Sequence, residues 1–396
     1  MVSSRWRPFE LSIFSKMSQL AATHNAVNLA QGFPDFDGPQ EIKEAAIQAI
    51  RQGRNQYAPA TGILELRQAL AKAQTAETGC EYDPQTEVTI FSGATEAIYC
   101  VITGLCEPGD EVIAFEPFYD SYPVGVMVAG ATFKTVPLQA PDWSFDRAAL
   151  EAAITPKTKL LLLNSPHNPT GKVFKRDELL FIAQLAKTHN FIVMTDEVYE
   201  KLVFTPARHM SLSSLPGMRD RTVVVSSTSK TFSMTGWKVG YAFAPAYLSK
   251  AIRIPHQYTV FCSATPLQYG MLAAMKLGPE YYLTFRDEYA DRRATLYRVL
   301  KDFGFQCQQP DGTYFIAANY QGLLDIPDTE FAEWMVQEVG VACIPLSVFY
   351  KDQDATRAKL RYVRFGFCKD VETIEAAAER LSKNLAGALE RYRAQH

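Results

Sequence analysis

The chain has 396 residues, of which 47% are hydrophobic and 21% are charged, a composition typical of a folded protein of about two domains. Its 40 lysines and arginines stand against 43 aspartates and glutamates, so the formal net charge is −3. This balance argues against a broad nucleic-acid surface, which needs a clustered basic excess. Because no run of about 18 apolar residues occurs, no membrane span is expected.

The cysteines and the first residues bear on the compartment. Seven cysteines are scattered without any C-x-x-C pair, so neither a zinc cluster nor a disulfide framework is predicted. Unpaired cysteines fit a reducing compartment. The segment 1–16 carries Arg5, Arg7 and Glu10 and has no apolar run of the kind found in a signal peptide. We therefore expect a soluble, cytoplasmic protein that holds no metal.

From about residue 38 onward, helical periodicity alternates with short apolar runs. Residues 41–51 are predicted to form an amphipathic helix, residues 88–91 a strand and residues 95–106 the next helix. Further strands are predicted at the apolar runs 111–115, 159–163, 191–194 and 222–226. Apolar strands separated by helices indicate a mainly parallel sheet covered by helices on both faces. Such sheets bind ligands at the carboxyl ends of their strands.

A domain boundary is predicted near residues 275–285. There Lys276-Leu-Gly-Pro279 ends one helical stretch, and a long charged helix follows at 281–303. The rest of the chain has an α+β pattern broken by glycines and prolines. The first residues are too few to fold alone and must pack on another part of the chain. We expect an N-terminal arm that forms part of the small domain, a large domain and a small C-terminal domain, at 1–37, 38–278 and 279–396.

Polar residues follow two of these strands, 88–91 and 159–163. After 88–91 comes Ser92-Gly-Ala-Thr-Glu96, whose free N–H groups at the start of a helix favour an anion. An ordinary strand-to-helix turn with a threonine cap is the alternative. After 159–163, the segment 164–171 has two prolines, which hold Asn168 in one direction or simply form a rigid surface turn.

The next two strands are also followed by polar groups. Thr195-Asp-Glu-Val-Tyr199 can place a carboxylate and a phenol beside one ligand, or can cap a helix. The hydroxyl-rich run Ser226-Ser-Thr-Ser-Lys230 ends in a lysine. Burial would lower the pKa of that lysine and make its amine nucleophilic, whereas an exposed, solubilising lysine is the alternative.

Together, these segments place an anion cradle, an amide, a carboxylate, a phenol and a lysine at one edge of one sheet. Pyridoxal phosphate chemistry needs this set, because the cofactor carries a phosphate, a pyridine nitrogen and an aldehyde that reacts with lysine. Motifs of competing chemistries are absent from the sequence: no G-x-G-x-x-G follows a strand, and neither a phosphate-binding P-loop nor H-E-x-x-H occurs.

The sequence resembles the class I, fold-type I pyridoxal-phosphate aminotransferases, in particular the methionine and kynurenine (glutamine transaminase K-like) enzymes. The resemblance runs from about Leu11 to Leu385. It rests on Asn28-Leu-Ala-Gln-Gly-Phe-Pro-Asp-Phe36, Asn55-Gln-Tyr57, Ser92-Gly-Ala-Thr-Glu-Ala97, Asn164 to Gly171, Asp196-Glu-Val-Tyr199, Ser229-Lys-Thr-Phe232, Thr235-Gly-Trp-Lys-Val-Gly240 and Tyr362-Val-Arg-Phe-Gly366. It implies an α/β fold with a mainly parallel, helix-covered sheet in the large domain, a smaller α+β domain and bound pyridoxal 5'-phosphate.

The resemblance also implies roles in cofactor binding. Lys230 corresponds to the lysine that forms the Schiff base and later shuttles a proton, and Asp196 to the carboxylate beside the pyridinium nitrogen. Asn168 and Tyr199 correspond to the groups that bind the phenolate oxygen. Phe118 corresponds to the ring that stacks on the cofactor, with core packing as the alternative. The phosphate would be bound by Ala94, Thr95, Ser227, Lys238 and, from the partner chain of a homodimer, Tyr57.

The substrate pocket is implied in the same way. Arg364 corresponds to the arginine that binds the α-carboxylate, and Arg361 is the competing candidate. Gly32 would let the backbone approach that carboxylate, with Asn168 nearby. Phe14 stands where the kynurenine enzymes have a tryptophan. Further pocket candidates, or else core residues, are His256, Tyr258 and Phe261; Arg253 is the nearby cation that would favour a dicarboxylate.

The expected function is transfer of the amino group of an uncharged or aromatic L-amino acid to a 2-oxo acid. Methionine, phenylalanine, tyrosine, glutamine and kynurenine are the candidate donors. A cysteine-S-conjugate β-lyase is an alternative, because elimination and transamination share their first steps. A non-enzymatic alternative is the ligand-sensing half of a transcription regulator. The small number of residues before Asn28 and the charge balance argue against it.

Overall fold

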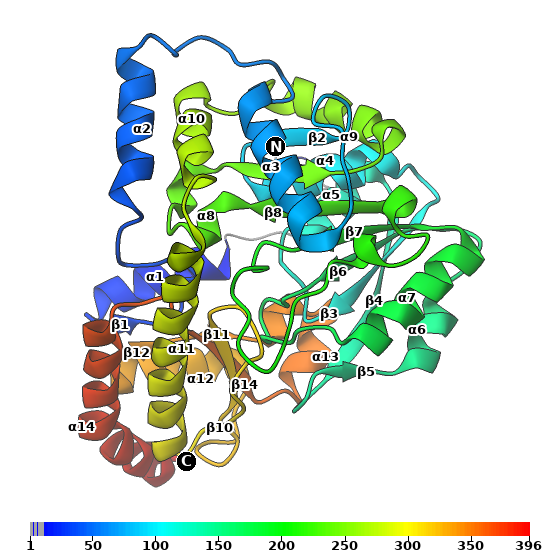
Figure 1. Ribbon diagram of the computed structural model, residues 1–396. Coiled ribbons are helices and arrows are strands. Elements are labelled where there is room, and N and C mark those ends of the chain that lie inside the picture. Colours follow the sequence, from blue (N-terminus) through cyan, green and yellow to red (C-terminus); the bar gives the residue numbers. More distant parts are fainter. Residues whose placement is uncertain (1–2, 4–5, 7–11) are drawn as a thin grey trace.

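The computed structural model describes residues 3, 6 and 12–396 (Figure 1). The expectations drawn from Arg5, Arg7 and Glu10, and the first part of the predicted arm, lie outside the described residues. The described chain contains a large sheet, a small antiparallel sheet and one isolated pair of short strands. Helices surround both sheets (Figure 1).

The large sheet has eight strands in the order β2-β9-β8-β7-β6-β3-β4-β5. They are β2 (Val88–Phe91), β3 (Glu111–Glu116), β4 (Thr132–Gln139), β5 (Ser144–Phe145), β6 (Thr158–Asn164), β7 (Ile192–Asp196), β8 (Thr222–Ser227) and β9 (Gly240–Phe243). Pairing is parallel from β4 through β3, β6 and β7 to β8, and antiparallel for β9, β2 and β5. The mainly parallel sheet is confirmed, whereas the antiparallel strand β9 has no counterpart in the sequence prediction.

Helices cover both faces of this sheet. They are α2 (Gln40–Arg51), α3 (Leu64–Thr78), α4 (Ala94–Leu105), α5 (Tyr122–Ala129), α6 (Arg147–Ala153), α7 (Arg176–His189), α8 (Thr228–Thr231), α9 (Ala246–Thr259) and α10 (Thr265–Ala274). Alternate residues of the strands point to opposite faces, so Leu161 and Leu163 pack with α6 and α7. Leu160 and Leu162 pack with α4, α5 and α9. Burial on both faces explains why these strands are apolar throughout.

The small sheet has the order β10-β11-β14-β13 and is antiparallel. Its strands are β10 (Gln306–Cys307), β11 (Phe315–Asn319), β13 (Ile344–Pro345) and β14 (Tyr362–Gly366), and the helices around it are α1 (Ile13–Thr23), α11 (Pro279–Asp302), α12 (Asp328–Trp334), α13 (Gln353–Arg357) and α14 (Val371–Gln395). Short 3₁₀ turns lie at Leu212–Ser214, Arg219–Arg221, Thr235–Trp237 and Ser347–Phe349, and a π-helical turn at Met335–Val339. No helix of the described chain is long and apolar enough to cross a bilayer.

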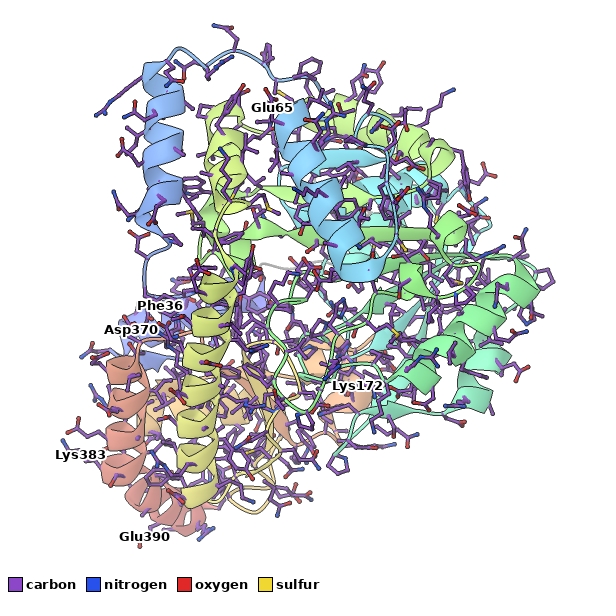
Figure 2. The ribbon with its side chains drawn as sticks, viewed as in Figure 1. Phe36, Glu65, Lys172, Asp370, Lys383 and Glu390 are labelled. Atoms are coloured by element: carbon purple, nitrogen blue, oxygen red, sulfur yellow. The ribbon has the colours of Figure 1, made fainter. Side chains whose placement is uncertain are left out.

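The N-terminal segment packs on the C-terminal part of the chain. Strand β1 (Val27–Asn28) pairs in parallel with β12 (Val341–Ala342). Farther along, the backbone N–H of Asp370 and the hydroxyl of Thr373 donate to the carboxylate of Asp35. Figure 2 shows Asp370 beside Phe36, which lies in the segment between β1 and α2. These contacts support the proposal that the arm belongs to the small domain; the domain limits themselves stay a prediction.

Candidate active site

A cavity of about 440 Å³ opens at the carboxyl ends of β6, β7 and β8. The last residues of these strands, Asn164, Asp196 and Ser227, all line it. Of the residues that the sequence predicted for the site, the cavity brings together Phe14, Gly32, Ala94, Thr95, Asn168, Asp196, Tyr199, Ser227, Lys230, Lys238 and Arg364. Tyr57 and Phe118 do not line it. The placement agrees with the rule that such sheets bind ligands where their strands end.

Asp196 is a buried carboxylate at the end of β7. Its Oδ2 accepts a 2.8 Å hydrogen bond from the hydroxyl of Tyr122, and the backbone N–H of Val198 points to Oδ1 at 3.4 Å. Burial raises the pKa of Asp196 to about 6, against the lowering effect of the Tyr122 bond. A buried carboxylate held in this way is suited to a cationic partner in the cavity. Tyr122, on α5, was missed by the sequence analysis.

Lys230 extends from the short helix α8 into the same cavity. Its Nζ lies 3.4 Å from the carbonyl oxygen of Gly32. Burial lowers the pKa of Lys230 to about 8, and the charges of Lys238 and Arg364 act in the same direction. A sizeable fraction of the amine is therefore neutral near pH 8, as a nucleophile or a general base requires.

The start of α4 forms an anion cradle. Gly93, the N-cap residue, has φ +88°, and a Cβ there would lie 2.9 Å from Cε of Lys238. The Lys238 side chain thus lies directly against the N-terminus of a 12-residue helix. Ser227 contributes a hydroxyl, which accepts from the N–H of Ser229. Free N–H groups, the helix dipole and an ammonium group together favour a phosphate.

Arg364, on β14, is almost completely buried. Its Nη1 donates to Oδ1 of Asn168 at 2.9 Å and its Nη2 to the carbonyl of Ala30 at 3.1 Å, while its Nε has no hydrogen-bond partner in the described chain. The ring centres of Phe315 and Phe14 lie 3.9 and 5.1 Å from the guanidinium carbon. Burial lowers the pKa of Arg364 to about 10. A buried guanidinium with an unused N–H is suited to binding a carboxylate.

The structure corrects the prediction for Phe118. Its ring packs edge-on against Phe133 at 5.1 Å, within the core beneath the sheet. The neighbouring Tyr119 lines the cavity instead, and its hydroxyl lies 3.2 Å from that of Thr95. Consecutive residues of a turn point in different directions, so the motif located the segment but not the ring that faces the cavity.

The structure decides between the two alternatives for His256, a pocket residue or a core residue. The side chain is fully buried, with Nδ1 2.6 Å from Glu96 Oε1 and Nε2 2.7 Å from the carbonyl of Ala60. It is therefore a core residue and not part of the substrate pocket. Tyr258 and Phe261 lie on the surface, outside the cavity lining.

The two competing arginines lie outside the cavity. Arg253 donates from Nε to the hydroxyl of Thr89 and from Nη2 to the carbonyl of Val88, so it is held against β2. Arg361 donates to the carboxylate of Asp325 at 2.7 Å. Neither guanidinium faces the cavity, whereas Arg364 does.

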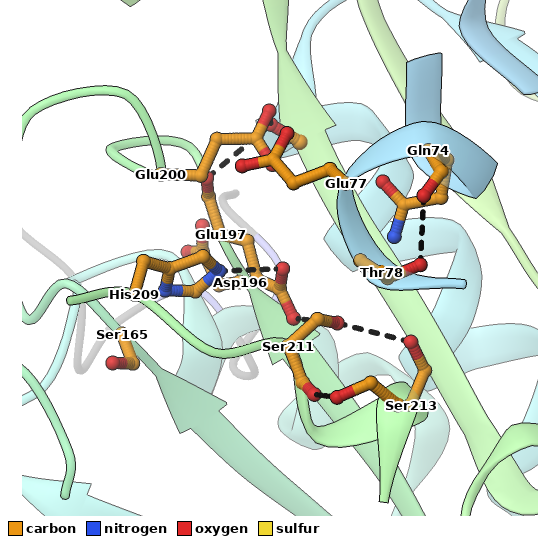
Figure 3. A network of polar contacts seen from close by, with 12 residues as sticks. Gln74, Glu77, Thr78, Ser165, Asp196, Glu197, Glu200, His209, Ser211 and Ser213 are labelled. Atoms are coloured by element: carbon orange, nitrogen blue, oxygen red, sulfur yellow. Dashed lines mark hydrogen bonds and ion pairs between the residues drawn. The ribbon is translucent and has the colours of Figure 1, made fainter. Parts of the chain in front are cut away.

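A polar network lies behind Asp196, and Figure 3 shows it from close by. His209 Nε2 lies 2.9 Å from Glu197 Oε2, and Ser211 donates to Glu197 Oε1 at 2.8 Å. Burial would raise the pKa of Glu197, but the charge of His209 and these bonds lower it below its usual range. Glu197, Glu200 and His209 are close enough to share a metal ion. Both carboxylate oxygens of Glu197 are already bonded within the protein. Because Glu197 directly follows β7, these bonds anchor the end of that strand.

Residues 24–381 match the family model for aminotransferases of class I and II. The chain belongs to this aminotransferase family. It is 44% identical to a probable N-succinyldiaminopimelate aminotransferase of Mycobacterium tuberculosis, over 96% of this chain and 98% of that protein. It is 41% identical to the methionine aminotransferase of Escherichia coli, over 93% and 95%. A crystal structure of an Escherichia coli protein with methionine aminotransferase function superposes with a TM-score of 0.92 at 40% identity, covering 96% and 99% of the two chains.

The aminotransferase uses pyridoxal 5'-phosphate, as enzymes of this class do. The cavity fits that cofactor, because it contains a buried carboxylate at Asp196, a buried amine of lowered pKa at Lys230 and an anion cradle at the start of α4. The resemblance to methionine and kynurenine aminotransferases is confirmed, the human kynurenine–oxoglutarate transaminase 1 being 35% identical over 92% of this chain. The predicted fold is confirmed as well.

Proposed function

We propose that this aminotransferase transfers the amino group of an uncharged or aromatic L-amino acid to a 2-oxo acid. The observation that carries the proposal is the composition of the cavity wall. Among the described residues, Arg364 is the one arginine that lines the cavity. Phe14 and Phe315 lie against its guanidinium, and Tyr119 lines the wall as well. One guanidinium can bind the α-carboxylate, and the rings can bury an apolar side chain.

Lys230 is proposed as the residue that holds the cofactor covalently and moves the proton. Bound pyridoxal phosphate supplies an electron sink for the Cα–H bond of the amino acid. The lowered pKa of Lys230 lets its released amine accept the α-proton close to neutral pH. Asp196, held by the hydroxyl of Tyr122, is proposed to keep a negative charge beside the ring nitrogen.

The remaining groups are proposed to position the two reactants. Asn168 already bonds Arg364, so its side chain can link the carboxylate-binding guanidinium to the cofactor oxygen. Tyr199 is proposed to donate to the same oxygen. Tyr119, in place of Phe118, is proposed to cover the face of the cofactor ring, since it lines the cavity. The phosphate group is assigned to Ala94, Thr95, Ser227 and Lys238.

The donor preference is the first test. We expect kcat/KM for methionine or phenylalanine to exceed that for aspartate by at least about tenfold, which equals about 1.4 kcal/mol of transition-state binding. The second carboxylate of aspartate would be buried without a guanidinium, at a cost of roughly several kcal/mol. Burial of an apolar side chain instead gains about 25 cal/mol per Å² of apolar surface. The measurement is a steady-state scan of amino donors with 2-oxoglutarate as acceptor.

The matched control is Arg253→Ala, which removes the guanidinium held by Thr89 and should leave the preference unchanged. The scan includes N-succinyldiaminopimelate, the compound named for the Mycobacterium tuberculosis relative, which carries additional carboxylates. If it or aspartate were the best donor, the proposed substrate class would be wrong. Steady release of pyruvate from a cysteine S-conjugate without any 2-oxo acid would favour the β-lyase instead.

The assembly is proposed to be a homodimer with Tyr57 at the interface. The side chain of Tyr57 is 82% exposed and meets Phe261 edge-on at 5.2 Å. Tyr258, at the end of α9, is also 82% exposed. The hydroxyl of Thr265 donates to the carbonyl of Gln56 and accepts from the N–H of Ala58, so it fixes the backbone on both sides of Tyr57. Exposed aromatic residues held on a rigid surface are typical of an interface.

The free thiols of all seven cysteines fit the proposed cytoplasmic location.

Light scattering should therefore give a particle of twice the chain mass, and Tyr258→Asp should shift it toward the monomer with loss of activity. A carboxylate placed in an apolar interface has to be desolvated without a partner. Tyr247→Asp is the control, because Tyr247 is also exposed but lies at the opposite end of α9, where its hydroxyl bonds Asp220. A fully active wild-type monomer would contradict the proposal.

A further inference from the structure

The carbonyl oxygen of Gly32, a residue that lines the cavity, accepts from two side chains. The hydroxyl of Tyr314 donates to it at 2.6 Å, and the amine of Lys230 lies 3.4 Å away. Tyr314 is fully buried and precedes β11, whereas Gly32 belongs to the N-terminal segment. The phenol therefore makes the short bond to this carbonyl, and the lysine makes only a long one.

The same tyrosine forms part of the walls around the amine. Nζ of Lys230 lies 5.7 Å from the ring centre of Tyr314 and 5.8 Å from that of Tyr199. The two rings meet edge-on at 5.1 Å and 85°. On its other side, Tyr314 stacks with Tyr289 at 6.1 Å. Tyr314 is thus fixed by rings on two sides, and its hydroxyl has one defined direction.

Gly32 is confined as well. A Cβ at this position would lie 2.8 Å from Cζ of Phe315, the ring that packs on Arg364. Two residues earlier, the carbonyl of Ala30 accepts from Arg364. The backbone that carries the shared carbonyl is therefore held between the arginine, the phenylalanine and the phenol.

We propose that Tyr314 is a positioning residue for Lys230, acting through the carbonyl of Gly32. Its hydroxyl satisfies this partly buried carbonyl and leaves the lysine with a weak contact. The amine then stays close to the reacting atoms but is free to move between them. The inference rests on the proposed role of Lys230 and not on the identity of the amino donor.

Without the hydroxyl, the partly buried carbonyl of Gly32 has Lys230 as its remaining side-chain donor. A carbonyl binds an ammonium more strongly than a neutral amine, so the charged form of Lys230 becomes more stable. The other charged or titratable groups around the amine are Lys238, Arg364, Asp196, Cys368 and Tyr199. Tyr314→Phe leaves the four groups other than Tyr199 unchanged. It also removes the interaction of the hydroxyl with Tyr199, but burial holds the pKa of Tyr199 well above its usual value, so this phenol stays neutral and a shift of the pH profile reports the amine. Since the neutral amine accepts the proton, the acid limb of kcat should move to higher pH.

The test compares the holoenzymes of Tyr314→Phe and Tyr320→Phe with the wild type. Tyr320 is the matched control, because its buried hydroxyl also bonds a backbone carbonyl, that of Ile326 at 2.8 Å, outside the cavity. For Tyr314→Phe, we expect the acid limb of kcat to rise by about half a pH unit or more, with KM for the donor within about twofold. The control should keep the wild-type profile. Each assay uses whichever donor proves best, so an error in the donor class leaves this comparison intact.

Two outcomes overturn the inference. An unchanged pH profile with a raised KM would show that the hydroxyl only orders the Gly32 backbone. Equal shifts in Tyr314→Phe and Tyr320→Phe would show a general effect of losing a buried hydroxyl. The melting temperatures of both holoenzymes are measured in parallel, and a melting temperature that falls without a shift of the profile also contradicts the inference. A cofactor label on a lysine other than Lys230 is a separate result, which refutes the role of Lys230 itself.

Discussion

Lys230→Ala should abolish transamination, lowering kcat by at least about a thousandfold, because proton transfer by a positioned base alone contributes roughly 10²–10⁴-fold. The structure places this amine in the cavity with its pKa lowered to about 8, so it can act both as nucleophile and as base. The measurement is the rate of 2-oxo-acid formation from the best donor, with the cofactor in excess. Borohydride reduction of the wild-type holoenzyme, followed by peptide mapping, should place the phosphopyridoxyl group on Lys230.

Lys187→Ala is the control for this variant. Its amine contacts the carbonyl of Pro216 on the surface, and its loss should leave kcat unchanged. Lys238 and Lys172 are the informative alternatives for the label. Lys238 lies in the cavity, and Lys172 is buried in an ion pair with Glu178. Finding the label on either one would refute the assignment of Lys230.

Arg364→Ala should lower kcat/KM for every amino donor by a similar factor. Removing one partner of a buried charge pair costs about 2–5 kcal/mol, which corresponds to roughly 30-fold to several thousandfold. All donors should be affected alike, because each presents the same α-carboxylate to the guanidinium. The measurement is kcat/KM for methionine, phenylalanine and glutamine in the variant and the wild type.

The control for this change is Arg361→Ala. Arg361 lies three residues earlier and bonds Asp325 away from the cavity, so its loss should leave kcat/KM within about twofold. A loss confined to one class of donors in Arg364→Ala would mean that the guanidinium recognises the side chain. In that case, the α-carboxylate must be bound elsewhere, and the orientation proposed for the substrate is wrong.

Much of the architecture could be predicted because its causes are local. The predicted strand at 88–91 matches β2, and the run 159–163 lies within β6, since a strand buried on both faces must be apolar throughout. The polar residues Asp196 and Lys230 follow such runs and meet at one sheet edge, as parallel strands require. Strand β9 pairs with β8, the strand just before it, and with β2, which is distant in the sequence; the sequence analysis predicted no strand there.

The errors in the candidate site arose because the sequence does not say in which direction these side chains point. Phe118 and Tyr119 follow a strand in an irregular segment, where no period says which ring faces the cavity. Arg253 and His256 lie on one face of α9, three residues apart, and that face packs against β2 and α4. Nearness to the site in the sequence therefore did not mean nearness to the substrate pocket.

Residues that act at long range were missed altogether. Tyr122 bonds Asp196 from α5, and Tyr314 bonds Gly32 from the position just before β11. In the sequence, a tyrosine in an apolar stretch cannot be told from an ordinary core residue. The hydrogen-bond partner of its hydroxyl depends on the tertiary fold. Such residues can be recognised once distances are known, because a buried hydroxyl needs a partner.

The parallel pairing of β1 with β12 has a consequence for the order in which the protein can be made. Translation delivers β1 first, yet its partner at Val341–Ala342 leaves the ribosome hundreds of residues later. Asp196, at the end of β7, and Lys230, on α8, emerge well before that point. The backbone at Gly32 and the side chain of Arg364 can meet only when β14 has also emerged, since Arg364 bonds the carbonyl of Ala30. The residues that one chain contributes to the proposed cofactor site therefore all emerge before Arg364, the residue proposed to bind the α-carboxylate of the substrate.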